Sequence, residues 1–75
     1  MYLKNMQLCF SRLGVSVEII SIVLEGAARR RLEDLGISIG SAVTPISENA
    51  GNLIIKIGES RVAINRALAS KILVK

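Results

Sequence analysis

The near absence of aromatic side chains is the feature that most constrains how this chain can fold. Its 75 residues include one tyrosine, one phenylalanine and no tryptophan, although 51% of them are hydrophobic. A domain of this length buries only about 60% of the surface that its unfolded chain exposes, so a small core must be filled efficiently. That core must consist of isoleucine, valine and leucine, and β-branched residues favour strands. We therefore expect one small, mainly β domain.

Short apolar segments separated by turn residues predict five strands. The first is apolar on both faces, which is typical of a strand in a tight barrel or at a corner between sheets. Pro45 in the second strand predicts a sheet edge or a bulge. Short strands, tight turns and one crossover helix indicate a small, strongly bent barrel. The expected strands cover residues 15–24, 42–47, 53–57, 62–64 and 72–74.

The segment 25–37 is rich in Ala, Arg, Leu and Glu, which are strong helix formers. Ala28, Leu32 and Leu35 recur at helical spacing and form one narrow apolar stripe. A helix this short is unstable alone in water, so we expect Leu32 and Leu35 to hold it against the barrel. Asn65 can cap a second helical turn near the C-terminus.

Glycines mark the predicted turns. Gly36 follows the last apolar residue of the predicted helix, and Ile37 just beyond it is placed to contact Leu32. These are the features of a Schellman cap, in which the residue after the helix adopts a left-handed conformation. Gly40 and Gly58 are likewise expected to serve backbone geometry in turns.

The side chains that usually carry catalysis or bind transition metals are scarce. The chain has no histidine, and Cys9 is its only cysteine, so histidine-based triads, disulfides within the chain and common zinc sites are excluded. The carboxylates show no metal-ligand spacing, and no phosphate-binding loop is present. We expect no enzymatic activity, no cofactor and no metal site. No apolar run is long enough to span a membrane, so we expect a cytoplasmic protein.

The best candidate for a functional surface is the run Arg29-Arg30-Arg31. In the predicted helix these cations lie near the N-terminal end, and Glu33 and Asp34 lie near the C-terminal end, which is the reverse of what the helix dipole favours. The pairs Arg29–Glu33 and Arg30–Asp34 offset part of this cost. The arginines thus either form a solvated, self-paired face or dock an acidic partner.

The segment 30–43, RRLEDLGISIGSAV, resembles the signature of the ferrous iron transport protein A family, FeoA. The similarity continues through Gly58-x-x-x-Val62-Ala63-Ile64 and Ala69-x-x-Ile72-x-Val74. Leu13, Ile39 and Leu68 depart from the family pattern at positions typical of turns or surfaces. The resemblance covers residues 6–75, which we expect to form the domain, with residues 1–5 as a short N-terminal extension.

This resemblance implies an SH3-like β-barrel with one short crossover helix and a C-terminal helical turn. It implies a cytosolic accessory protein of ferrous iron uptake, linked to transition metals through its pathway. The implied partner is the cytoplasmic domain of FeoB, the GTP-binding iron permease. The same barrel occurs in repressors of the DtxR type, but no DNA-binding helix-turn-helix is present here. The hypothesised contact residues are Arg29, Arg30, Arg31, Leu32 and Leu35.

Two further interactions follow from charge and strand edges. The formal net charge of +4 suits RNA as well as an acidic protein, so a small RNA-binding barrel is the alternative function. Against it, only Tyr2 and Phe10 could offer a ring on which bases stack. An exposed fourth or fifth strand could also pair edge to edge, giving weak self-association.

Overall fold

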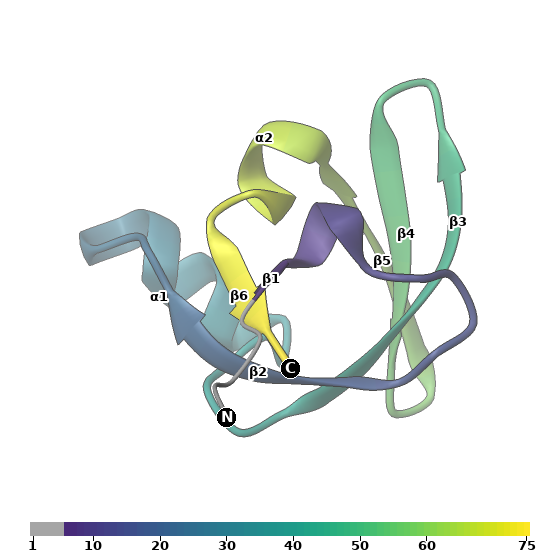
Figure 1. The fold of residues 1–75 in the computed structure, drawn as a ribbon. Helices are drawn as coiled ribbons and strands as arrows, with labels where there is room; N and C mark the ends of the chain where they lie inside the picture. The colour runs from purple at the N-terminus through teal and green to yellow at the C-terminus, as the bar shows by residue number, and fades with distance from the viewer. Residues whose placement is uncertain (1–5) are drawn as a thin grey trace.

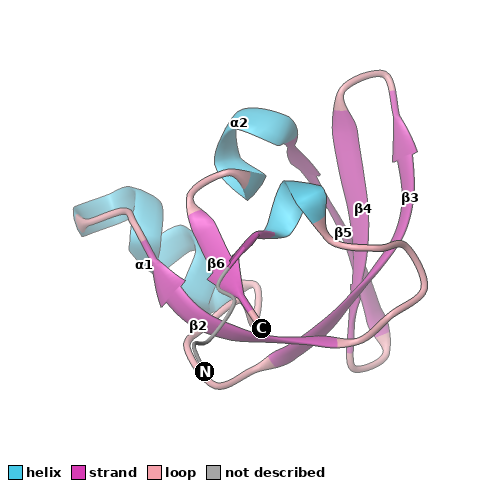
Figure 2. Ribbon diagram, viewed as in Figure 1, coloured by secondary structure: helices cyan, strands magenta, loops and turns pink. Residues whose placement is uncertain are grey.

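The protein was analysed as a computed structural model that describes residues 6–75, so the expected extension at residues 1–5 lies outside the described residues. The described chain is mainly β, as the sequence predicts, with short helical segments between strands (Figures 1 and 2). The pairing of Met6 and Gln7 with the C-terminal strand was not predicted. The elements are β1 (Met6–Gln7), the 3₁₀ turn η1 (Leu8–Phe10), β2 (Val17–Ile22), α1 (Gly26–Asp34), β3 (Ala42–Asn49), β4 (Asn52–Ile57), β5 (Ser60–Asn65), α2 (Arg66–Ala69) and β6 (Ile72–Val74).

The strands pair antiparallel in the order β1-β6-β2-β3-β4-β5, and the sheet bends into a barrel-like shape (Figure 1). Strand β2 forms the corner of this sheet. Val17 and Glu18 pair with β3, whereas the rest of β2 pairs with β6 through a register shift between Ile19 and Ser21. A strand at such a corner has apolar residues on both faces, as the sequence of β2 indicated. The strand is shorter than the predicted residues 15–24.

Pro45 lies at an irregularity of β3, as predicted. The register with β4 shifts between Pro45 and Ser47, which is a β-bulge. Pro45 is fully buried, and its carbonyl accepts a hydrogen bond of 2.7 Å from the amide of Gly14. This hydrogen bond holds the loop before β2 against β3. The register shift directly after Pro45 confirms the predicted bulge.

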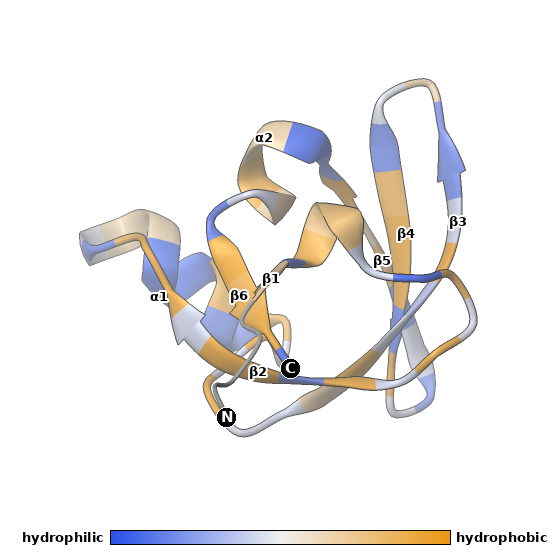
Figure 3. Cartoon of the chain, viewed as in Figure 1, coloured by the Kyte–Doolittle hydropathy of each residue, from blue (hydrophilic) through white to orange (hydrophobic). Residues whose placement is uncertain are grey.

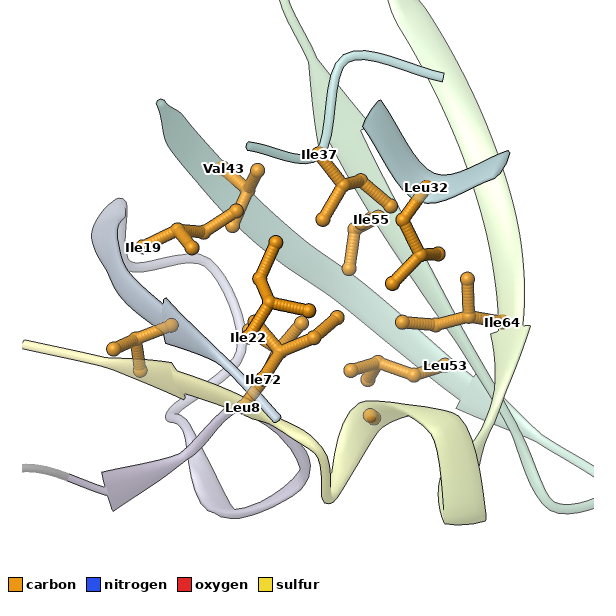
Figure 4. Close-up of a cluster of buried hydrophobic side chains, with 12 residues drawn as sticks. Leu8, Ile19, Ile22, Leu32, Ile37, Val43, Leu53, Ile55, Ile64 and Ile72 are labelled. Atoms are coloured by element: carbon orange, nitrogen blue, oxygen red, sulfur yellow. The ribbon is translucent and has the colours of Figure 1, made fainter. Parts of the chain in front are cut away.

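The interior is filled by aliphatic side chains, and no polar or charged side chain of the described residues is buried. In Figure 4 side chains from β2, β3, β4, β5, β6 and the α1 region converge on one another. Apolar stretches of β4, β6 and η1 stand out in Figure 3. The core consists of Leu8, Ile19, Ile22, Leu32, Ile37, Val43, Leu53, Ile55, Ile64, Ala69, Ile72 and Val74.

The short helix α2 begins where the sequence predicts. The Asn65 side chain caps it by accepting a 2.7 Å hydrogen bond from the amide of Leu68. Leu68 also packs against the core, whereas Leu13 and Ile39 are about half exposed. The two exposed positions behave as surface residues, and Leu68 differs because α2 turns it toward the barrel.

Candidate partner-binding surface

Helix α1 connects β2 to β3 and lies on one side of the barrel (Figure 1). Leu32 is its only buried residue, with 2% of its surface exposed. Ala28 is exposed and Leu35 keeps 45% of its surface in solvent. The expectation that Leu32 and Leu35 both anchor the helix is therefore wrong for Leu35. The helix meets the core over a single turn, and Leu35 already belongs to its C-terminal cap.

The Schellman cap expected at Gly36 is present. The amide of Ile37 donates to the carbonyl of Leu32 at 2.9 Å, and the amide of Gly36 donates to the carbonyl of Glu33 at 3.0 Å. Gly36 has φ of +94°, which is the left-handed region. Ile37 is completely buried, so the cap and its apolar side chain form the second anchor of the helix.

Gly40 and Gly58 also adopt positive φ, +94° and +59° respectively. Gly40 lies in the predicted turn before β3, where the amide of Ser41 donates to the carbonyl of Ser38 at 3.0 Å. Gly58 lies in the two-residue turn between β4 and β5. These residues set the backbone path on either side of the barrel and offer no side chain to a partner.

The three arginines of α1 differ in their contacts. Arg29 Nε donates to Glu33 Oε2 at 3.1 Å, which is the predicted pair. Arg30 and Arg31 are exposed, and neither has a carboxylate oxygen within 4.0 Å in residues 6–75. The predicted Arg30–Asp34 pair is therefore not formed.

The charges of α1 oppose the helix dipole less than the sequence suggests. The helix starts at Gly26 and ends at Asp34, so Arg31 falls in its last turn, where a cation is favourable. Only Glu33 and Asp34 remain in an unfavourable position. The prediction that all three arginines lie at the positive end of the helix is wrong, because the helix is shorter at its C-terminal end than the segment 25–37.

One exposed face of α1 carries both charge and apolar area. Residues four apart on a helix are neighbours on its surface, so Arg31 lies next to Leu35. Arg30 is adjacent and exposed. We define Arg30, Arg31 and Leu35 as the α1 surface. Leu32 lies beneath it in the core and can affect a partner only through the helix that it anchors.

The described residues show no feature typical of a catalytic or metal centre. Within them no group of three or more His, Cys, Asp or Glu side chains is close enough to hold a metal ion, and no pocket is found. Cys9 is half-buried, and its Sγ lies 3.6 Å from Gln7 Oε1. In the same part of the chain no helix has the length and hydrophobicity needed to cross a membrane.

A second surface cluster was not predicted from the sequence. Arg66 Nη1 donates to Glu48 Oε2 at 2.6 Å. This contact joins the start of α2 to the C-terminal end of β3, and both segments are blue in Figure 3. The Arg66 guanidinium also lies 5.6 Å from the ring centre of Phe10, a cation–π contact. No local sequence signal links these residues, because each comes from a different element.

Comparisons with known proteins give consistent results over nearly the whole chain. The model of the FeoA domain family matches residues 6–75. A protein of Methanocaldococcus jannaschii, provisionally named Fe(2+) transport protein A, is 38% identical over 68 residues, which span 91% of this chain and 83% of that protein.

Solved structures share the fold. A crystal structure of an iron uptake regulatory protein, FeoA, has a TM-score of 0.85 at 27% identity and covers 97% of each chain. FeoA of Stenotrophomonas maltophilia, described as a prokaryotic SH3 domain protein complexed with zinc, has a TM-score of 0.78 at 25% identity, with 93% of this chain and 89% of that chain covered. A manganese-dependent transcriptional repressor shares the fold over 93% of this chain and 40% of its own, with a TM-score of 0.83 at 23% identity. The match to the family model over residues 6–75, supported by the fold shared with solved FeoA structures, shows that the chain belongs to the FeoA family of ferrous iron transport proteins.

Proposed function

We propose that this chain is a cytoplasmic accessory protein of ferrous iron uptake that acts by contacting the cytoplasmic GTP-binding domain of a FeoB-type permease. It performs no chemistry itself. Its contact with the permease is made by the α1 surface, where Arg30 and Arg31 meet acidic side chains and Leu35 meets an apolar one.

The observation that carries the proposal is the exposure of two arginines without a carboxylate partner in the described residues. Arg29 differs because its guanidinium is paired with Glu33 at 3.1 Å. Solvated arginines beside a half-exposed leucine match the composition of protein interfaces, in which arginine is enriched and an apolar side chain anchors the contact. A helix anchored by Leu32 and Ile37 presents these groups in a defined geometry.

The test compares two charge reversals of equal size. Arg30→Glu/Arg31→Glu and Lys71→Glu/Lys75→Glu each change the formal net charge by −4, from +4 to 0. All four residues are exposed, so neither change disturbs the core. Binding to the purified GTP-binding domain of the permease is measured by titration calorimetry at about 50 mM salt, where screening is weak.

We expect the α1 reversal to weaken binding at least tenfold and the lysine reversal to change it much less, because only the first removes contacts at the interface. Circular dichroism and unfolding curves verify that both variants fold. Equal losses would show a nonspecific charge effect, and unchanged binding of the folded α1 variant would refute the role of Arg30 and Arg31.

One observation favours the alternative of RNA binding: Phe10 is 64% exposed, next to Arg66. A base could stack on this ring. A single ring gives a short platform, however, and the Arg66 guanidinium is already paired with Glu48. A salt-dependent gel shift with single-stranded RNA that is lost in Phe10→Ala would support this alternative, and the absence of a shift at low salt would remove it.

A further inference from the structure

Strand β5 is an outer strand of the sheet, because β4 is its only strand partner among residues 6–75. The two-residue turn at Gly58 and Glu59 makes Ile57 and Ser60 a hydrogen-bonded pair. Hydrogen-bonded pairs alternate along an antiparallel ladder, so Val62 and Ile64 also bond to β4. The backbone groups of Arg61 and Ala63 consequently point away from β4.

These outward groups have no backbone or side-chain hydrogen-bond partner in the described residues. The side chains of Arg61, Ala63 and Asn65 are also exposed, whereas Val62 is half-buried and Ile64 is buried. The edge of β5 therefore presents unpaired amides and carbonyls beside small or polar side chains.

Strand β5 lacks most of the features that protect natural sheet edges. Its six residues pair with β4 without any register shift, so no bulge twists it away. It contains no proline and one charged residue, Arg61. The opposite edge is β1, which has two residues in the described part of the chain. Strand β5 is thus the regular open edge of the described barrel.

We propose that β5 pairs antiparallel with β5 of a second copy of this chain, centred on Ala63. In this arrangement Ala63 faces Ala63 and Arg61 faces Asn65 of the second copy. The alternation of the ladder allows only registers that pair outward-facing residues with each other. A register centred on Arg61 would place two guanidinium groups directly opposite, which is unfavourable.

The occupant is a second copy because the strand complements itself: the small Ala63 permits close approach, and the charged Arg61 meets a neutral amide. The interface is small, and two copies with net charge +4 repel each other. We therefore expect weak association, with a dissociation constant on the order of 1 mM that falls as salt screens this repulsion.

The test uses two matched variants, Ala63→Lys and Ala67→Lys. Both alanines are exposed, one on β5 and the other on α2, and both changes add one positive charge. Sedimentation equilibrium and diffusion NMR are measured from about 0.05 to 2 mM protein, at low and high salt. Two lysines facing each other across the edge should weaken dimerisation by up to about fivefold in Ala63→Lys, and Ala67→Lys should dimerise like the unmodified chain.

A second variant tests the backbone directly. Ala63→Pro removes the outward amide, which has no role in the β4–β5 ladder, so a folded Ala63→Pro variant should be monomeric. A chain that stays monomeric at 2 mM and high salt would overturn the proposal. Equal dimerisation of Ala63→Lys and Ala67→Lys would do the same, because it would place the contact elsewhere.

Discussion

Two glycines with the same φ differ in the space around them, and this contrast allows a quantitative test of the packing beside α1. Gly36 and Gly40 both have φ of +94°. A Cβ atom built on Gly36 would lie 3.2 Å from Cγ2 of Ile57, whereas a Cβ on Gly40 would meet nothing within 4 Å. Alanine is strained by the positive φ at both positions. Only at position 36 does its Cβ also come too close to another side chain.

The expected magnitudes follow from these two terms. A left-handed conformation costs an L-residue about 1–2 kcal/mol. Replacing glycine by alanine also stabilises the fold by about 0.4–1 kcal/mol, because it lowers the conformational entropy of the unfolded chain. Gly40→Ala should thus destabilise the fold by about 1 kcal/mol. The contact with Ile57 adds an overpacking cost of about 1 kcal/mol, which is the low end of the usual range. Gly36→Ala should therefore destabilise the fold by about 2 kcal/mol.

The assay is urea unfolding followed by circular dichroism, with a check that the slope against urea is unchanged. A difference of about 1 kcal/mol corresponds to a melting temperature roughly 4–8 °C lower for Gly36→Ala than for Gly40→Ala. In a background carrying Ile57→Ala, which removes the conflicting Cγ2, the extra cost should vanish. Equal destabilisation by the two variants, or an extra cost that persists with Ile57→Ala, would refute the steric reasoning.

Three further predictions concern single features of the fold and are tested by thermal and urea unfolding. Leu32→Ala should cost about 2–5 kcal/mol and release α1, whereas Leu35→Ala, at a half-exposed site, should cost under about 1 kcal/mol; equal costs would contradict Leu32 as the anchor. Lys56 lies directly opposite Arg61 in the β4–β5 ladder, so two like charges face each other. Lys56→Glu should therefore stabilise the fold by about 0.2–1 kcal/mol at low salt, and Lys56→Gln, which only removes the repulsion, should stabilise it less. Ala50→Asn should raise the free energy of unfolding by about 0.5–1 kcal/mol, because Ala50 has φ of +52° in the β3–β4 turn, where asparagine is favoured. A loss of stability would contradict that turn geometry.

The proposed functions of α1 and β5 can be tested separately, because they use different elements. The α1 variant Arg30→Glu/Arg31→Glu leaves β5 unchanged, so it should lose permease binding and still dimerise in high salt. Ala63→Lys should show the reverse behaviour. Loss of both properties in one folded variant would show that a single surface serves both contacts.

Local sequence signals predicted the local structure well. The C-terminal cap of α1 at Gly36, the N-terminal cap of α2 at Asn65 and the irregularity at Pro45 each depend on one residue with a strong conformational preference. The mainly β fold followed from the aliphatic composition, since β-branched residues pack well on a pleated surface. The family could also be identified from the order of short motifs along the chain.

Tertiary packing decided the features that depend on residues distant in sequence. Leu32 is buried and Leu35 is half exposed, although both lie on the same predicted stripe, because the barrel touches only one turn of the helix. The spacing of Arg30 and Asp34 permits an ion pair, but the structure forms none between them, which the spacing alone does not predict. The open edge of β5 was decided by the order of strands in the sheet. The sequence alone determined which residues turn and cap, because each of these roles depends on one residue's conformational preference. Three-dimensional packing determined which apolar residues enter the core and which surfaces are available to a partner.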